Sequence, residues 1–315
     1  MSEKPASNSS GQDLSIVAKA SEWWSLLAFR LRGNPNEFEM GCLFDSLAEY
    51  DTYLQKYSNI ALQDATILEI GFGARPNRLI AMMSLGLDAI GVDLDQPLLH
   101  RRVRDFREIY EKNGFERLLK TLVRSTLFDA SERRALKRSI REHGGTPTVD
   151  DDRFVVADAA SAAFDERMRA RPVDLITSED VFEHIPTDSL RLVVARMGQW
   201  LKPHGIALIR PNVFTGIAGG HLVEWYFPVH ADRDRKSEPW EHLRKRRFKA
   251  NTFLNELTLA DYRELFAEHF EILEERVLFD DLGREFATPE VLAELRDYPE
   301  EELFSNRVLF VLRPR

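Results

Sequence analysis

The chain has 315 residues, of which 43% are hydrophobic and 30% charged, a composition typical of a globular protein with one elaborated domain or two smaller ones. The formal net charge of −9 argues against a general nucleic-acid-binding protein. The single cysteine, Cys42, excludes an intrachain disulfide, which suits a reducing compartment. We expect its side chain to be buried among apolar residues. Since no apolar run approaches the ~20 residues of a membrane span, we expect a cytoplasmic protein.

The N-terminal region predicts a tail followed by helices. Residues 1–13 are polar and predict a disordered tail. Residues 14–60 predict a helical cap, in which residues 14–32 carry a broad apolar face and residues 44–57 form a further helix. A Gly-Asn-Pro sequence at residues 33–35 separates the two helices.

Residues 65–95 contain the pattern around which the rest of the chain is organised. Residues 66–70 are a short apolar run of the kind that a buried parallel strand requires. Gly71 and Gly73 then form a turn into a helix, and a second apolar run ends at Asp93. Glycines let the backbone pass close to a ligand, and an acid after the second strand is placed to accept hydrogen bonds from ribose hydroxyls. This pattern predicts half of a nucleotide-binding sheet.

The residues around the glycines indicate which nucleoside this sheet binds. A dinucleotide site requires G-x-G-x-x-G, and the third glycine is absent here. Glu69 instead gives E-x-G-x-G, with an acid that repels a pyrophosphate and suits a cationic ligand. The sequence resembles motif I of the class I S-adenosylmethionine-dependent methyltransferases. The resemblance implies that Glu69, Gly71 and Gly73 line the methionine end of the cofactor and that Asp93 holds the ribose. Many members have a third glycine where this chain has Arg75, which leaves the path of the loop open.

Residues 97–150 predict an arginine-rich helical insertion. Leucines at helical spacing, among them Leu119 and Leu122, predict that one face is packed. The arginines are interpreted as solvated side chains paired with nearby acids, and the alternative is recognition of an anionic group on the substrate. After a third strand at residues 153–157, the resemblance implies that Asp158, with Ala159 beside it, contacts the adenine.

A fourth apolar strand at residues 173–177 is followed by the sequence S-E-D-V-F-E-H. Open α/β sheets bind their ligands at the carboxyl ends of such strands. The sequence resembles the D-x-x-E-H motif that follows strand four in small-molecule methyltransferases, and its three residues are Asp180, Glu183 and His184. The resemblance also implies that Ser178 and Glu179 line the methionine side of the cofactor.

Two roles remain open for this motif. In the ubiquinone-biosynthesis O-methyltransferases and the small-RNA 2′-O-methyltransferases, an E-x-x-E-H sequence binds a divalent ion. By that resemblance the candidate ligands are Asp180, Glu183, His184 and the later His221. D-x-x-E-H is widespread in methyltransferases without a metal, however, and we expect none here.

The second role is that of a general base, which takes the proton of an acceptor hydroxyl during methyl transfer. His184 and His221 are the candidates, because histidine acts as a base near neutral pH. His221 is favoured, since it lies in a glycine-rich loop followed by the aromatic sequence Trp225-Tyr226-Phe227, which would form a substrate wall.

The remaining elements complete the sheet. A helix at residues 187–200 leads to a fifth strand at residues 206–210, and residues 212–255 form a second insertion. Thr258 predicts the start of another helix. The last two strands, at residues 270–279 and 307–312, have no full crossover helix between them and fit the antiparallel pair that closes a methyltransferase sheet.

We therefore expect an α/β protein with a doubly wound, seven-stranded mixed sheet of the Rossmann-like methyltransferase fold, with the methyltransferase domain at residues 61–315. The predicted function is O-methylation, by S-adenosylmethionine, of a small and possibly sugar-like or anionic metabolite, with a histidine as general base and no nucleic-acid partner. One alternative is a metal-assisted 2′-O-methyltransferase of RNA or a glycan methyltransferase. The other is a non-catalytic scaffold that binds the cofactor.

Overall fold

The computed structural model describes residues 35–100, 102–127, 129–222, 225, 237–247, 250 and 252–315. Residues 36–315 belong to one compact unit. The predicted tail at residues 1–13 and the first predicted helix of the cap, at residues 14–32, lie outside the described residues.

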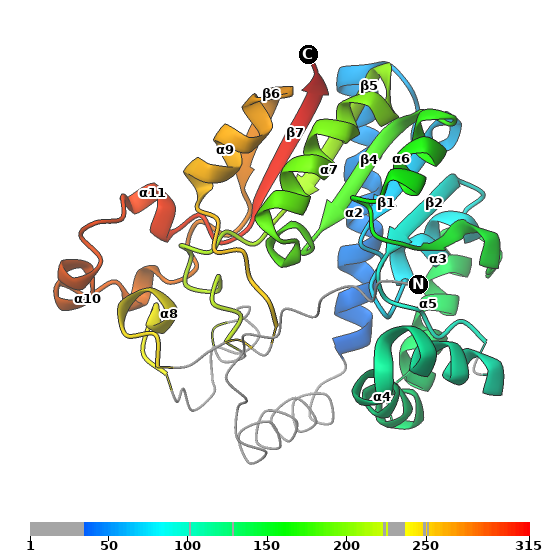
Figure 1. Cartoon of the computed structure of the whole chain (residues 1–315), viewed down its shortest axis with the longest axis horizontal. Helices are drawn as coiled ribbons and strands as arrows, with labels where there is room; N and C mark the ends of the chain where they lie inside the picture. Colours follow the sequence, from blue (N-terminus) through cyan, green and yellow to red (C-terminus); the bar gives the residue numbers. More distant parts are fainter. Residues whose placement is uncertain are drawn as a thin grey trace, which may run out of the picture. The chain divides into compact units, whose positions relative to one another are not determined.

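A seven-stranded mixed sheet lies at the centre of this unit, in the order β3-β2-β1-β4-β5-β7-β6 (Figure 1). The strands are β1 (Thr66–Ile70), β2 (Asp88–Asp93), β3 (Phe154–Val156), β4 (Val173–Glu179), β5 (Leu201–Arg210), β6 (Phe270–Val277) and β7 (Val308–Pro314). The first five are parallel to one another, whereas β7 lies between β5 and β6 and is antiparallel to both. The predicted mixed sheet with an antiparallel end is confirmed.

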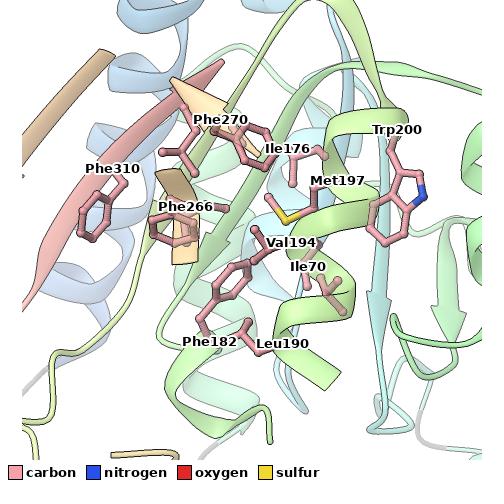
Figure 2. Close-up of a cluster of buried hydrophobic side chains, with 14 of the residues drawn as sticks. Ile70, Ile176, Phe182, Leu190, Val194, Met197, Trp200, Phe266, Phe270 and Phe310 are labelled. Carbon is pink, nitrogen blue, oxygen red and sulfur yellow. The ribbon is translucent and has the colours of Figure 1, made fainter. Parts of the chain in front are cut away.

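Helices cover both faces of the sheet. The longer ones are α2 (Pro35–Ser58), α3 (Asn77–Ser84), α4 (Val103–Leu127), α5 (Asp129–Glu142), α6 (Ala162–Arg169), α7 (Thr187–Trp200) and α9 (Leu259–Ala267). One apolar cluster joins the sheet to α6, α7 and α9, and a second joins it to α2, α3 and α5. Figure 2 shows part of the first cluster, in which the rings of Phe266 and Phe310 meet edge to face with their centroids 4.9 Å apart. The doubly wound arrangement follows from these two clusters.

The insertion at residues 97–150 contains α4 and α5, but its packing differs from the prediction. Helix α5 buries Leu136 and Ile140 against the sheet layer. In α4, by contrast, Leu119 and Leu122 are 50% and 39% exposed. The predicted packed face is therefore wrong for these two leucines. The helix is also kinked at Gly114, whose φ of 80° is not helical.

A third apolar cluster lies beside the carboxyl end of β5. Ile217 and Trp240 from the second insertion pack there with Leu295 and Phe304, from the segment between β6 and β7. That segment contains two short helices, α10 (Pro289–Glu294) and α11 (Glu300–Leu303), which the sequence analysis did not predict. The insertion also contains the short helix α8 (Glu241–Arg244).

Two general expectations can be compared with the structure. Cys42 is exposed on α2, so the expectation that it is buried is wrong. Within the described ranges, no helix has both the length and the hydropathy needed to cross a membrane.

Candidate active site

The glycine turn after β1 is built by backbone conformation and close contact. Gly71 and Gly73 have φ values of 84° and 65°, in the left-handed region that favours glycine. The Gly71 amide donates to the Val92 carbonyl at 2.8 Å, which joins the turn to β2. A Cβ atom on Gly71 would lie 2.2 Å from Cγ2 of Val181, the second residue after β4. The turn therefore requires glycine and brings the ends of β1, β2 and β4 together.

Asp93 lies at the end of β2 and fixes this turn. Its carboxylate accepts hydrogen bonds from the Gly73 and Asp95 amides, each at 2.7 Å. Burial raises the pKa of Asp93, although the two amide hydrogen bonds oppose that shift. Each carboxylate oxygen accepts one of these two amide hydrogen bonds and so has a second lone pair. Asp93 is thus placed to accept ribose hydroxyls.

Asp158 lies next to this position on the neighbouring strand. The Ala157 amide donates to the Asp93 carbonyl at 2.9 Å, which joins the end of β3 to the end of β2. The Asp158 side chain is exposed and accepts from the Ala160 amide at 2.8 Å. Ala159 packs against the first apolar cluster. The structure therefore brings Asp93 and Asp158 to the same edge of the sheet, as the predicted nucleoside site requires.

Glu69 and Glu179, from the ends of β1 and β4, are joined through an arginine that the sequence analysis missed. Arg78 Nη2 donates to Glu179 Oε2 at 2.7 Å, and its Nη1 donates to Glu69 Oε1 at 3.2 Å. Glu179 also accepts from Arg210 at 2.8 Å and from Tyr50 of α2 at 2.5 Å. Glu179 therefore has its oxygens committed to protein partners and acts by holding Arg78.

The two carboxylates differ in their ionisation. Burial raises the pKa of Glu179, but the charges of Arg78 and Arg210 outweigh it and lower the value to about 2. Burial raises the pKa of Glu69 to about 7 despite the charge of Arg78. Glu69 Oε2 is buried and has no hydrogen-bond partner among the described residues. Glu69 thus retains an unused acceptor that suits a cationic ligand.

Arg75, which stands where many related sequences have a third glycine, contacts the insertion helix α5. Its guanidinium donates to Glu132 Oε2 of α5 at 2.7 Å. Asn77 donates to the other oxygen of Glu132 at 2.5 Å. Glu132 is buried, with 3% of its surface exposed. The arginine therefore attaches the turn to the insertion.

Glu183, His184 and His221 form a compact cluster beyond the end of β4. One ligand atom from each lies within 4.8 Å of those of the other two. The two imidazole rings meet edge to face, with centroids 4.9 Å apart, and His221 Nε2 lies 3.8 Å from Glu183 Oε1. Asp180 lies outside this cluster, because its carboxylate pairs with Arg307 and accepts from Asn212.

The surroundings determine which atoms of the cluster can react. His184 Nδ1 lies 2.9 Å from the Phe253 carbonyl. Since a carbonyl only accepts, Nδ1 carries a proton, so that Nε2 has the lone pair when the ring holds a single proton. Burial lowers the pKa of His221 to about 3, with smaller effects from His184 and His242. Burial also raises the pKa of Glu183, whose Oε2 has no hydrogen-bond partner among the described residues.

Other predicted site residues have different positions. Ser178 donates to the Ile70 carbonyl at 2.8 Å and so joins β4 to β1. Trp225 is 6% exposed, donates to Ser237 and packs against Phe286, so it belongs to the third apolar cluster and not to a substrate wall. Tyr226 and Phe227 lie outside the described residues.

Asn212 is a further residue that the sequence analysis missed. Its amide donates to both Asp180 and Glu183, at 2.8 and 2.9 Å. The only signal in the sequence is its place immediately after the Arg210-Pro211 end of the fifth strand.

Comparisons with known proteins agree with this arrangement. A family model described as a methyltransferase domain matches residues 45–269, well over half of the chain. A comparison with curated proteins found no match.

Solved structures with a similar fold share little sequence with this chain. The plantazolicin methyltransferase BpumL, in complex with a triazolic desmethylPZN analog and SAH, is 13% identical with a TM-score of 0.46, and the match covers 95% of this chain and 93% of that chain. The geranyl diphosphate C-methyltransferase from Streptomyces coelicolor A3(2), solved with Mg²⁺, geranyl-S-thiolodiphosphate and S-adenosyl-L-homocysteine, is 14% identical with a TM-score of 0.40, and the match covers 85% and 76%. The putative methyltransferase in a complex with the Trm112 activator from Haloferax volcanii is 16% identical with a TM-score of 0.38, and the match covers 85% and 92%.

The family match extends from α2 to the start of β6 and includes the glycine turn, the acids after β2 and β3, and the motif after β4. The chain therefore belongs to the methyltransferase domain family and is an S-adenosylmethionine-dependent methyltransferase of class I.

Proposed function

We propose that the protein methylates an oxygen of a small, sugar-like metabolite and that a histidine next to the cofactor crevice takes the proton of the acceptor hydroxyl. The observation that carries this proposal is the cluster of Glu183, His184 and His221 just beyond the end of β4. Methyl transfer from a sulfonium requires an aligned nucleophile, and a hydroxyl becomes one when its proton is accepted.

His184 is the better general base of the two histidines. Its Nδ1–H donates to the Phe253 carbonyl at 2.9 Å, so the ring is oriented and Nε2 has the lone pair that accepts a proton. His221 has a pKa lowered to about 3, chiefly by burial, and is therefore a weak base. We therefore prefer His184, although the sequence pattern favoured His221. In the proposed mechanism His221 and Glu183 border the acceptor, and Asn212 fixes the Glu183 carboxylate through a hydrogen bond of 2.9 Å.

The experiment that tests oxygen transfer uses S-adenosylmethionine with a ¹³C-labelled methyl group and a small-molecule extract as the source of acceptors. The carbon chemical shift of the transferred methyl distinguishes O-methyl from N-, S- and C-methyl products. We expect a new O-methyl signal from the wild-type protein. We expect His184→Ala to lower its rate of formation by about 10²–10⁴-fold. His204→Ala is the matched control, because His204 is exposed at the start of β5. A product methylated only on nitrogen, sulfur or carbon would contradict the proposal.

A metal-assisted reaction is the second candidate. The observation that favours it is that one carboxylate and two imidazoles lie within 4.8 Å of one another, with Glu183 Oε2 buried and unbonded among the described residues. A bound divalent ion would lower the pKa of a coordinated hydroxyl, and the ligands would be Glu183, His184 and His221 without Asp180. Equilibrium dialysis against Co²⁺ and Mg²⁺, compared between wild type and Glu183→Gln, tests for an ion independently of turnover. Activity that survives EDTA would favour the histidine base.

The alternative of a polyanionic RNA or glycan acceptor has less support. Several arginines of the insertion already pair with acids of the chain: Arg104 with Glu108, Arg107 with Glu111 and Arg117 with Asp95. Exposed pairs of this kind are typical of a solvated helix face. A small acceptor is therefore the proposal that we prefer.

A further inference from the structure

A cavity of about 230 Å³ lies between α3 and the insertion helix α5, with the segments at residues 98–100 and 147–149 completing its wall. Helices α3 and α5 are neighbours in Figure 1. Residues 74–77 of the glycine turn line the cavity, whereas neither Asp93 nor any residue of the Glu183 cluster does.

Most of the cavity wall is apolar. Ile80 of α3 faces Leu136 and Ile140 of α5, and Leu98 and Val149 complete this surface. Leu136 and Ile140 are buried, whereas Val149 is 37% exposed at the rim. Pockets for drug-sized ligands usually have about 300–1,000 Å³, so this one suits a smaller molecule with a short apolar body.

The charged residues of the wall favour an anionic group on that molecule. Three cations, Arg75, Arg133 and Lys137, line the cavity together with two acids, Asp129 and Glu132. Arg75 is bonded to Glu132, and Arg133 donates to the carbonyls of Leu98 and Leu99. Lys137 is exposed and makes no hydrogen bond or ion pair within the described part of the chain. Its ammonium group is thus available to a carboxylate at the rim.

The cavity is connected to the cofactor turn through Glu132. This buried side chain forms part of the wall and holds both Arg75 and Asn77, at 2.7 and 2.5 Å. These residues follow Gly73, whose amide bonds to Asp93 at 2.7 Å. A molecule in the cavity therefore touches the residues that determine where the turn lies.

We propose that this cavity is a second ligand site, which takes a small amphipathic carboxylate with its chain against Leu136 and Ile140 and its charged group at Lys137. Occupancy changes the affinity for the cofactor through the contacts of Glu132 with Arg75 and Asn77. By linkage, the cofactor changes the affinity for the carboxylate by the same factor.

Hexanoate is the probe, with hexan-1-ol and hexylamine as matched ligands without the negative charge. Binding is followed by NMR titration of the full chain saturated with S-adenosylhomocysteine, so that the cofactor site is already filled. We expect saturable binding of hexanoate and weaker binding of the alcohol and the amine. Lys137→Gln should weaken hexanoate by up to about fivefold, the upper range for an exposed ion pair. Arg134→Gln is the control, because Arg134 lies on the same helix, donates to the Ala130 carbonyl and does not line the cavity.

Val149→Trp tests the position of the site, because an indole at this exposed rim fills the cavity without changing the core. We expect it to abolish hexanoate binding while the melting temperature and the affinity for S-adenosylhomocysteine stay near those of wild type.

The coupling to the cofactor is tested by calorimetry. Hexanoate should change the affinity of the wild type for S-adenosylhomocysteine, and Glu132→Gln should reduce that effect. Three results would overturn the proposal: no saturable binding, equal binding of hexanoate and hexan-1-ol, or full binding by Val149→Trp. An unchanged cofactor affinity in the presence of bound hexanoate would refute the coupling. None of these outcomes bears on methyl transfer.

Discussion

Asp93 is the residue for which the structure gives the most specific prediction. Its carboxylate accepts the Gly73 and Asp95 amides at 2.7 Å each, and it lies where the ribose is expected. Asp93→Ala removes both acceptors, whereas Asp93→Asn keeps one neutral oxygen. The two variants therefore separate the loss of charge from the loss of all acceptors.

The magnitude follows from these contacts. A hydrogen bond to a charged group contributes about 1.5–3 kcal/mol, and a stranded buried partner costs about 1–3 kcal/mol. Asp93 is half-buried, so water replaces part of the loss, and we expect the free energy of unfolding to fall by about 3 kcal/mol in Asp93→Ala. The loss of the ribose contacts should weaken cofactor binding by a further 1–3 kcal/mol, or roughly 5- to 150-fold in Kd.

Isothermal titration calorimetry with S-adenosylhomocysteine, together with urea unfolding, measures the two effects separately. Asp93→Asn should fall between wild type and Asp93→Ala in both. Asp95→Asn is the matched control, because the Asp95 side chain pairs with Arg117 of α4 and not with the turn. An affinity of Asp93→Ala within twofold of wild type would refute the assigned role in binding the ribose.

Three further predictions concern other contacts of the site and its frame. The pKa of Glu69 is raised to about 7, so its carboxylate forms as the pH rises through 7. The affinity for the cationic S-adenosylmethionine, measured by calorimetry, should therefore rise from pH 6 to 8. A Glu69→Gln variant whose affinity rises as steeply with pH would contradict this reasoning. Glu302 is buried and accepts hydrogen bonds from two amides at the start of α9 and from a threonine hydroxyl. Glu302→Ala should therefore lower the free energy of unfolding, measured in urea, by about 3 kcal/mol. A change below ~0.5 kcal/mol would contradict the assignment of Glu302 as a residue that stabilises the start of α9. Gly71→Ala should abolish binding of S-adenosylhomocysteine, because the added Cβ would lie 2.2 Å from Val181. Gly86→Ala should bind normally, because at the same kind of backbone conformation, with a φ of 80°, its Cβ would lie 3.6 Å from the Gln63 side chain. Equal binding by both variants would refute the steric argument.

The parallel half of the fold was predictable because its signals are local. The apolar runs at β1 and β4 and the glycines between β1 and α3 are contiguous in the sequence. Boundaries were less accurate. Strand β5 begins at Leu201, before the predicted residue 206, because Lys202-Pro203-His204 interrupts its apolar pattern.

The rest depended on contacts between distant residues. Arg78 reaches Glu179 across 101 positions and Arg75 reaches Glu132 across 57, so no spacing rule could connect these pairs. The same limit applies to Asp180, which the D-x-x-E-H pattern groups with Glu183 but which pairs with Arg307 in the folded protein. Leu119 and Leu122 show the reverse case, since their helical spacing was correct but their side chains are 50% and 39% exposed.

The position of β7 has a consequence for the order of assembly. This strand pairs with β5 on one side and β6 on the other, although the ribosome makes it after both. During synthesis the parallel strands that carry the cofactor residues can pair first. Until β7 is made, the edges of β5 and β6 that pair with it have unsatisfied backbone hydrogen-bonding groups. Chaperone dependence and premature aggregation should therefore concentrate in the interval before residues 308–314 emerge from the exit tunnel.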